Sequence, residues 1–253
     1  MPTVLIEKQS SKITVITFNR PDRRNALTLE LMNEFIAALR VASDEASERV
    51  LILRGAGAAF CAGLDLKAAT TQNSHATAEM VANTMIALSQ TRLITIAAVH
   101  GAAVAGGAGI MSACDYVVAA EGTKIGYPEV RRGLVAGLVM TFLRRQVRER
   151  DIRELLFSGE IIEAQRAREI GLVNRVVPAA DVMREAQKFA ELVLLGAPEA
   201  TVQTKRLLEE LWSSSVKEDV DLALKYHIQA RDSAEAREGI TAFNEKRPPK
   251  WAV

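Results

Sequence analysis

Residues 93–114 read LITIAAVHGAAVAGGAGIMSAC, and this uncharged stretch decides which fold the 253-residue chain can adopt. Its first seven residues, LITIAAV, are uncharged, mostly apolar and rich in β-branched side chains, as in a buried strand. The remainder is interrupted by Gly101, Gly106, Gly107 and Gly109. We therefore predict a strand, a glycine turn and a buried helix. A single membrane span is the alternative, because the stretch is long enough to cross a bilayer.

The residues upstream of this stretch show a similar order of strand, loop and helix. β-Branched runs at 4–6 and 13–18 flank a polar QSSK segment and predict a hairpin. Thr28 is a predicted N-cap, because apolar residues follow it at helical spacing. Residues 50–53 predict a second buried strand, which leads into the loop RGAGAAFCAGLDLK.

The downstream residues predict two further strands, at 115–119 and 173–177, with Gly171 just beyond the end of a helix. From residue 180 the strands stop and helical patterns continue, with breaks near 196–198 and 213–215. The chain is therefore predicted to be an α/β protein. We expect residues 1–195 to form the core and residues 196–253 a helical C-terminal region.

The composition excludes several classes of protein. The net charge of +1 provides no overall basic field, so we expect no nucleic-acid partner. Cys61 and Cys114 are the two cysteines, too few for a disulfide framework, which favours a reducing, cytoplasmic setting. The three histidines lie far apart and lack metal-ligand spacing, so we expect no metal site.

Two turns built from small residues are the best candidates for chemistry, at residues 62–64 and 105–107. Backbone N–H groups at turns and helix N-termini are free donors, and two that point at one spot stabilise a carbonyl oxygen that gains negative charge. A single glycine turn would be explained more simply by tight packing. Two such turns favour an oxyanion hole.

Five segments of the chain resemble the enoyl-CoA hydratase/isomerase, or crotonase, superfamily. The similarity covers essentially the whole chain, and it is carried by FNRPDRRNAL (18–27), GAGAAFCAGLDLK (55–67), HGAAVAGGAGIMSACD (100–115), YPEVRRGL (127–134) and SGEIIEAQRAREIGLVNRVV (158–177). The resemblance implies a spiral of ββα and βαβ units with a helical C-terminal region that builds homotrimers or dimers of trimers. It also implies an acyl-CoA thioester substrate and no separate cofactor, since coenzyme A is part of the substrate.

The same resemblance implies roles for individual residues. The N–H groups of Leu64 and Gly106 would form the oxyanion hole. The C-terminal region would cover a CoA bound at or beside a neighbouring subunit through Phe243 and Lys246, although Lys246 taken alone reads as a solvated surface lysine. The remaining CoA-binding positions would be Arg24, Ala26, Ala62, Gly63, Asp65, Leu66, Lys67 and Gly107.

One departure from the family pattern concerns the acid and base of the reaction. Hydratases of this superfamily carry two glutamates; Glu129 matches the second, whereas the first falls on Gly109. A single carboxylate suits proton transfer from C2 to C4, so we predict an isomerase that converts 3-enoyl-CoA to 2-enoyl-CoA, with Glu129 as acid and base. Another crotonase reaction, such as hydration or decarboxylation, and a low-activity acyl-CoA-binding paralogue are the alternatives.

Three further predictions concern the surroundings of this site. Residues 133–140 are bulkier than the usual loop of the family, which predicts a reshaped acyl pocket. Cys61 is expected to pack rather than to act as a nucleophile. Asp65 is expected to organise its loop or to cap a helix.

Overall fold

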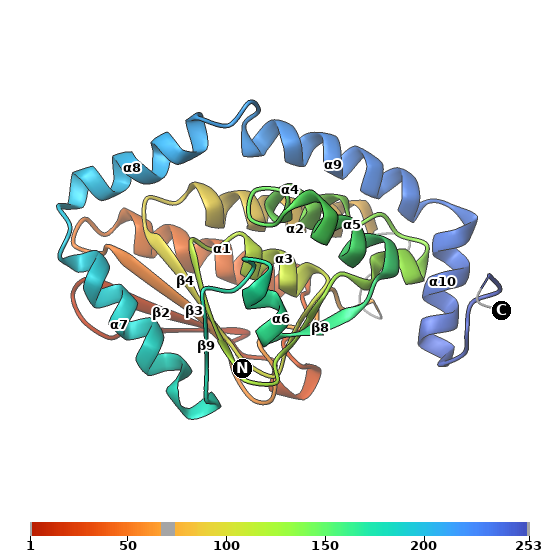
Figure 1. Ribbon diagram of the computed structural model, residues 1–253, viewed down its shortest axis with the longest axis horizontal. Coiled ribbons are helices and arrows are strands. Elements are labelled where there is room, and N and C mark those ends of the chain that lie inside the picture. Colours follow the sequence, from red (N-terminus) through yellow and green to blue (C-terminus); the bar gives the residue numbers. More distant parts are fainter. Residues whose placement is uncertain (1, 67–73, 252–253) are drawn as a thin grey trace.

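The computed structural model describes residues 2–66 and 74–251, which form an α/β fold, as predicted (Figure 1). The strands are arranged in two sheets. The larger sheet has the strand order β1-β2-β3-β4-β6-β9. These strands are β1 (Val4–Lys8), β2 (Ile13–Phe18), β3 (Val50–Gly55), β4 (Ile94–Val99), β6 (Tyr116–Ala120) and β9 (Arg175–Val177).

The predicted hairpin starts this sheet. β1 and β2 pair antiparallel, with Val4 opposite Phe18, and every later pair in the sheet is parallel. β3 and β4 are buried along nearly their whole length, which explains why both read as continuous apolar runs rather than as alternating patterns.

Helices cover both faces of the larger sheet (Figure 1). α7 (Val182–Leu194) packs on one face through Val182, Ala186 and Ala190. The opposite face is covered by α1 (Leu29–Asp44), α2 (Ser74–Gln90) and α3 (Gly106–Ser112). The Thr28 N-cap is confirmed, because its Oγ1 accepts the N–H of Leu31 at 3.3 Å.

The uncharged stretch 93–114 forms β4, then β5 (Ala102–Val104), then the buried helix α3. The predicted order of strand, turn and helix is confirmed, and β5 is an addition that the sequence did not indicate. Within residues 2–66 and 74–251, no helix combines the length and apolar character needed to cross a membrane.

β5 belongs to a second sheet of three short strands, with β7 (Lys124–Gly126) and β8 (Ile161–Glu163). We did not predict this sheet, because three-residue strands are too short to show an alternating pattern. Its importance lies in its position, since β5 leads into α3 and β7 leads into the short helix η3 (Pro128–Arg132).

The C-terminal helices complete the fold. α9 packs against α4 and α2, and α10 packs against η3 at the edge of the molecule (Figure 1). The predicted breaks fall between α7 and α8 and between α8 and α9, and Gly171 has a positive φ just after α6. The remaining elements are η1 (Pro21–Arg23), α4 (Gly137–Leu143), α5 (Glu149–Ser158), α6 (Ala164–Glu169), η4 (Ala179–Asp181), α8 (Pro198–Glu210), α9 (Val216–Arg231) and α10 (Ala234–Glu245).

Candidate active site

The two glycine turns lie side by side in register. Cys61 forms a parallel bridge with Ala103, with hydrogen bonds from Cys61 N to Ala102 O and from Val104 N to Cys61 O, both of 3.1 Å. Beyond this bridge, the two segments continue to Leu64 and Gly106, which both line one cavity. The fold therefore brings together the two residues predicted for the oxyanion hole.

Small residues make this close approach possible. A Cβ at Gly63 would lie 2.7 Å from Val104 O and 3.4 Å from Gly106 N. A Cβ at Gly107 would lie only 2.3 Å from Cys61 O. Since real Cβ atoms do not approach backbone oxygen so closely, glycine is required at both positions.

The N–H groups of Leu64 and Gly106 are free donors. The neighbouring bonds, Leu27 N to Gly63 O at 2.8 Å and Asp65 N to Leu27 O at 2.9 Å, bypass Leu64 itself. Gly106 is the first residue of α3, so its N–H has no intrahelical acceptor. Neither N–H has an acceptor in the described part of the chain. Ala105 has a φ of 51°, a strained value for alanine, directly before the second donor.

Asn25 holds the first loop in place, and we did not identify it from the sequence. It is fully buried, and its Nδ2 donates to Ala56 O at 2.9 Å and to Ala59 O at 2.8 Å. Its Oδ1 accepts the N–H of Arg20 at 2.8 Å. The amide thus ties the segment before α1 to the loop that ends at Leu64.

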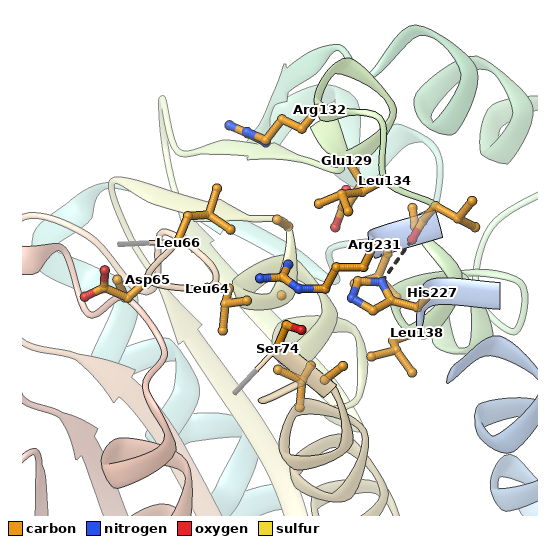
Figure 2. Close-up of a pocket in the computed structure, with 18 of the residues that line it drawn as sticks. Leu64, Asp65, Leu66, Ser74, Glu129, Arg132, Leu134, Leu138, His227 and Arg231 are labelled. Atoms are coloured by element: carbon orange, nitrogen blue, oxygen red, sulfur yellow. Dashed lines mark hydrogen bonds between the residues drawn. The ribbon is translucent and has the colours of Figure 1, made fainter. Parts of the chain in front are cut away.

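Both N–H groups belong to residues that line a cavity of about 280 Å³ (Figure 2). Its apolar wall comes from α2, α4 and the segment before α4. The lining includes Leu134, Val135, Ala136, Gly137, Leu138 and Val139, which belong to the segment 133–140 that was predicted to reshape the pocket. The polar lining residues include Arg23, Asp65, Ser74, Glu129, Arg132, His227, Arg231 and Asn244.

Glu129 enters this cavity from η3. Pro128 starts this short helix, and the buried Tyr127 before it shares a 2.8 Å hydrogen bond with Ser112 of α3. The Glu129 side chain is 8% exposed, and its Oε2 is buried without a hydrogen-bond partner in the described structure. Figure 2 shows the carboxylate directed into the cavity.

Burial raises the pKa of Glu129 to about 7, although its own backbone and the nearby Arg132 cation oppose the shift. A buried carboxylate that is half-protonated near neutral pH can both take and return a proton. Arg132 stacks on Phe243 of α10, with 4.2 Å between the guanidinium carbon and the ring centre. Phe243 also lines the cavity, whereas its contact with CoA stays a prediction.

Gly109 stands at the position where the resemblance places the first of the two hydratase glutamates. A Cβ at this position would lie 2.3 Å from Met85 Cε and 2.6 Å from Val139 Cγ1. The space beside Gly109 is therefore filled by apolar side chains of α2 and α4.

We expect Gly109→Glu to lower the free energy of unfolding by more than about 2 kcal/mol, because it overpacks the core and buries a carboxylate. Met85→Ala should restore part of this loss in the double variant, since it removes the atom closest to the new side chain. Urea unfolding of the wild type, both single variants and the double variant would measure this coupling. Additive losses would contradict the packing explanation.

The other predicted site residues fall into three groups. Ala26, Ala62, Leu66 and Asp65 line the cavity. Gly63 and Gly107 lie behind it, where they allow the two loops to pack.

In the third group, Arg24 and Lys246 do not line the cavity. Arg24 is exposed with a φ of 50°, and its neighbour Arg23 faces the cavity instead. Lys246 is exposed at the C-terminal end of α10. Lys67 lies outside the described residues. The CoA contacts of Arg24, Lys67 and Lys246 therefore stay predictions.

Asp65 and Cys61 have the surroundings expected of structural residues. Asp65 pairs with Arg20 at 3.2 Å, which supports the predicted role in organising the loop. Burial raises the pKa of the Cys61 thiol to about 12, so the thiol stays protonated and packs.

His227 and Arg231 of α9 also line the cavity, and sequence analysis missed them. They lie four residues apart and therefore on one face of the helix, and this spacing is the signal that could have revealed them. His227 Nδ1 lies 3.2 Å from Val135 O. Because a carbonyl oxygen only accepts, the proton sits on Nδ1, which leaves Nε2 as the acceptor.

Comparisons with known proteins agree with this geometry. The family model described as enoyl-CoA hydratase/isomerase matches residues 8–253. A Thermus thermophilus protein provisionally named an enoyl-CoA hydratase is 37% identical, covering 98% of this chain and 100% of that protein. An enoyl-CoA hydratase of Mycobacterium tuberculosis is 34% identical, covering 99% of this chain and 96% of that protein. The crystal structure of an enoyl-CoA hydratase from Mycobacterium avium has a TM-score of 0.88 at 29% identity, with 99% of both chains covered. The chain therefore belongs to the enoyl-CoA hydratase/isomerase superfamily, the crotonases, and has their fold.

Proposed function

We propose that this crotonase-superfamily enzyme converts 3-enoyl-CoA to 2-enoyl-CoA thioesters, with Glu129 as the acid and base. The observation that carries this proposal is a buried, unpaired carboxylate in an apolar cavity that also holds two free backbone donors. Such a combination suits the formation of an enolate, in which negative charge moves onto the thioester oxygen.

The proposed reaction moves one proton and consumes no other reactant. The N–H groups of Leu64 and Gly106 donate to the thioester oxygen, which makes the C2 protons more acidic. The Glu129 carboxylate takes a C2 proton, and the electrons of that C–H bond form a C1–C2 double bond while the carbonyl π electrons move onto the thioester oxygen, which gives the dienolate. When C4 is protonated with the C3–C4 π electrons, the carbonyl re-forms and the C1–C2 π electrons become the C2–C3 double bond. Protonated Glu129 then returns the proton to C4, which restores the carboxylate and releases the 2-enoyl-CoA.

The absence of a second free carboxylate in the described cavity favours isomerisation over hydration. Asp65 also lines the cavity, but its carboxylate is paired with Arg20. The space that a side chain at residue 109 would need is filled by Met85 and Val139. The described lining thus offers one carboxylate for proton transfer.

A direct test supplies 3-hexenoyl-CoA and 2-hexenoyl-CoA separately. The proposal expects conjugated product from the first ester and much slower loss of conjugation from the second. Substrate deuterated at C2 should deliver deuterium to C4 of the product, because one carboxylate serves both carbons. Faster hydration of 2-hexenoyl-CoA would overturn the proposal, and binding of both esters without turnover would favour the acyl-CoA-binding alternative.

Hydration is the second candidate, and His227 is the observation that favours it. Its Nε2 is an acceptor on a residue that lines the cavity, so it could orient a water molecule in place of a second glutamate. Burial, together with the nearby Arg231 cation, lowers the pKa of His227 and keeps the ring neutral at pH 7. In that case His227→Phe would abolish hydration of 2-hexenoyl-CoA, whereas the isomerase proposal expects isomerisation to persist in this variant.

The pH dependence of turnover provides an independent prediction. Because Glu129 must start as a carboxylate, kcat/KM should rise with pH through a midpoint near 7. Arg132→Gln should move the midpoint upward, because the Arg132 cation lowers the Glu129 pKa, and Arg132→Lys should leave it closer to wild type. Initial rates between pH 5 and pH 9 measure the midpoint. A midpoint near 4.5, the ordinary range of glutamate, would contradict a buried base.

Assembly and location are proposed on coarser grounds. Exposed apolar residues along the C-terminal helices suit burial between subunits of a homotrimer or a dimer of trimers. They are Leu207 and Leu208 on α8, Leu211 and Trp212 directly after it, and Leu222 and Tyr226 on α9. Cys61 and Cys114 are free and buried, which suits a cytoplasmic setting. The division into a core of residues 1–195 and a C-terminal region of residues 196–253 also stays a proposal.

A further inference from the structure

The last turn of α9 places a buried cation at the cavity. Arg231 is 8% exposed and lines the cavity together with His227, one turn earlier. Figure 2 shows its side chain extending from α9 across the cavity toward Leu64 and Ser74. A buried guanidinium inside a substrate cavity is costly unless something pairs with it.

The described residues leave this guanidinium without a partner. Its Nε and Nη1 are buried and make no hydrogen bond, and no carboxylate of residues 2–66 and 74–251 lies within 4.0 Å of it. The next residue, Asp232, lies 3.0 Å from His75, and its charge acts on Arg231 only at a distance, where it opposes the effect of burial on the Arg231 pKa. Burial lowers the pKa of Arg231, but a guanidinium stays protonated at neutral pH.

The other titratable groups that line the cavity do not balance this charge. His227 is neutral at pH 7 because burial lowers its pKa, and it therefore adds no negative charge. The cation that acts on Glu129 is Arg132, not Arg231. Asp65 is paired with Arg20. The cavity thus contains a buried guanidinium whose Nε and Nη1 donors are free, beside both polar and apolar lining residues.

We propose that Arg231 binds a carboxylate at the far end of the acyl chain, so that the preferred substrates are CoA thioesters of dicarboxylic acids. The inference rests on the proposed function only in that the cavity takes an acyl-CoA. A carboxylate matches the planar donor set of arginine, and a hydrogen bond between two charged groups is stronger than a neutral one. A hydrocarbon chain would leave the guanidinium desolvated and unpaired.

Saturated thioesters test this inference separately from the reaction, since they cannot be isomerised. Affinities would be measured by calorimetry for three pairs of equal chain length: glutaryl-CoA with pentanoyl-CoA, adipoyl-CoA with hexanoyl-CoA, and suberoyl-CoA with octanoyl-CoA. Both members of each pair carry the same CoA phosphates, so the ratio of their two affinities reports the contribution of the terminal carboxylate alone. We expect at least one dicarboxylic ester to bind at least about tenfold more tightly than its partner.

Arg231→Gln should reduce this ratio to about one, and Arg231→Lys should retain part of it. Lys225→Gln is the matched control, because it removes a positive charge from an exposed position of the same helix and should leave the ratio unchanged. The ratio is measured within one variant, so a partly unfolded preparation does not alter it.

Two results would overturn the inference: no dicarboxylic ester is preferred by the wild type, or the preference survives in Arg231→Gln. A preference that depends on Arg231 would stand even if 3-hexenoyl-CoA were not isomerised. Conversely, isomerisation without any preference would retain the proposed function and reject the carboxylate site.

Discussion

Glu129→Gln is expected to lower kcat for 3-hexenoyl-CoA by about 10²- to 10⁴-fold, which is the usual contribution of a positioned acid or base. Glutamine has nearly the same shape but cannot take the C2 proton, so the affinity for the saturated ester should remain close to wild type. Steady-state kinetics and calorimetry with hexanoyl-CoA would measure both quantities. Activity above one tenth of wild type would remove Glu129 from the proposed mechanism.

The stability of Glu129→Gln at different pH values tests separately whether Glu129 is a buried carboxylate. The pKa of Glu129 is raised to about 7 in the folded state, so the folded protein binds an extra proton between pH 4.5 and pH 7 and loses stability as pH rises through that range. At pH 8 the glutamine variant avoids this buried charge and should be more stable by about 1–3 kcal/mol. The gain should vanish near pH 4. Glu121→Gln, at an exposed position outside the cavity lining, should change neither activity nor this pH dependence.

Gly107→Ala is expected to lower kcat by about 10²- to 10³-fold, the effect of losing one oxyanion donor. The new Cβ would lie 2.3 Å from Cys61 O and 2.8 Å from Cys61 Cβ, so α3 and the 61–64 loop must separate. Because Leu64 lies on this loop and Gly106 is the first residue of α3, the separation moves their two N–H groups apart. Kinetics with 3-hexenoyl-CoA below the unfolding temperature would measure the loss.

Gly122→Ala is the matched control for this variant. Gly122 has a φ of 73°, but an added Cβ there meets no atom within 4 Å. The substitution should therefore cost about 1 kcal/mol of stability through backbone strain while leaving the oxyanion hole intact. Equal kcat values for Gly107→Ala and the wild type would show that the two N–H groups do not act as the hole.

The elements that the sequence predicted are those with strong local patterns. The hairpin of β1 and β2, the Thr28 cap of α1 and the strand, turn and helix within residues 93–114 are all present. Each depends on neighbours within a few residues, such as β-branched runs, a capping side chain or glycine at a turn. The second sheet was missed because β5, β7 and β8 each span three residues.

The residues of the candidate site also fall into those that local sequence patterns predicted and those that they did not. Leu64, Gly106 and Glu129 were predicted, because short motifs mark them and the fold places all three at one cavity. Arg132, His227 and Arg231 were missed. His227 and Arg231 lie about a hundred residues beyond Glu129, and only the packing of α9 on α2 and α4 brings them to the same cavity.

The sequence by itself therefore determined the glycine turns, the acidic residue and the order of strands and helices, since these follow from local backbone preferences and side-chain chemistry. Only the tertiary structure decided what those groups can do. Burial sets the Glu129 pKa near 7 and leaves the Arg231 guanidinium unpaired, and burial depends on which distant segments surround a side chain. The tertiary structure also places Met85 and Val139 in the space beside Gly109, which the identity of residue 109 alone could not reveal.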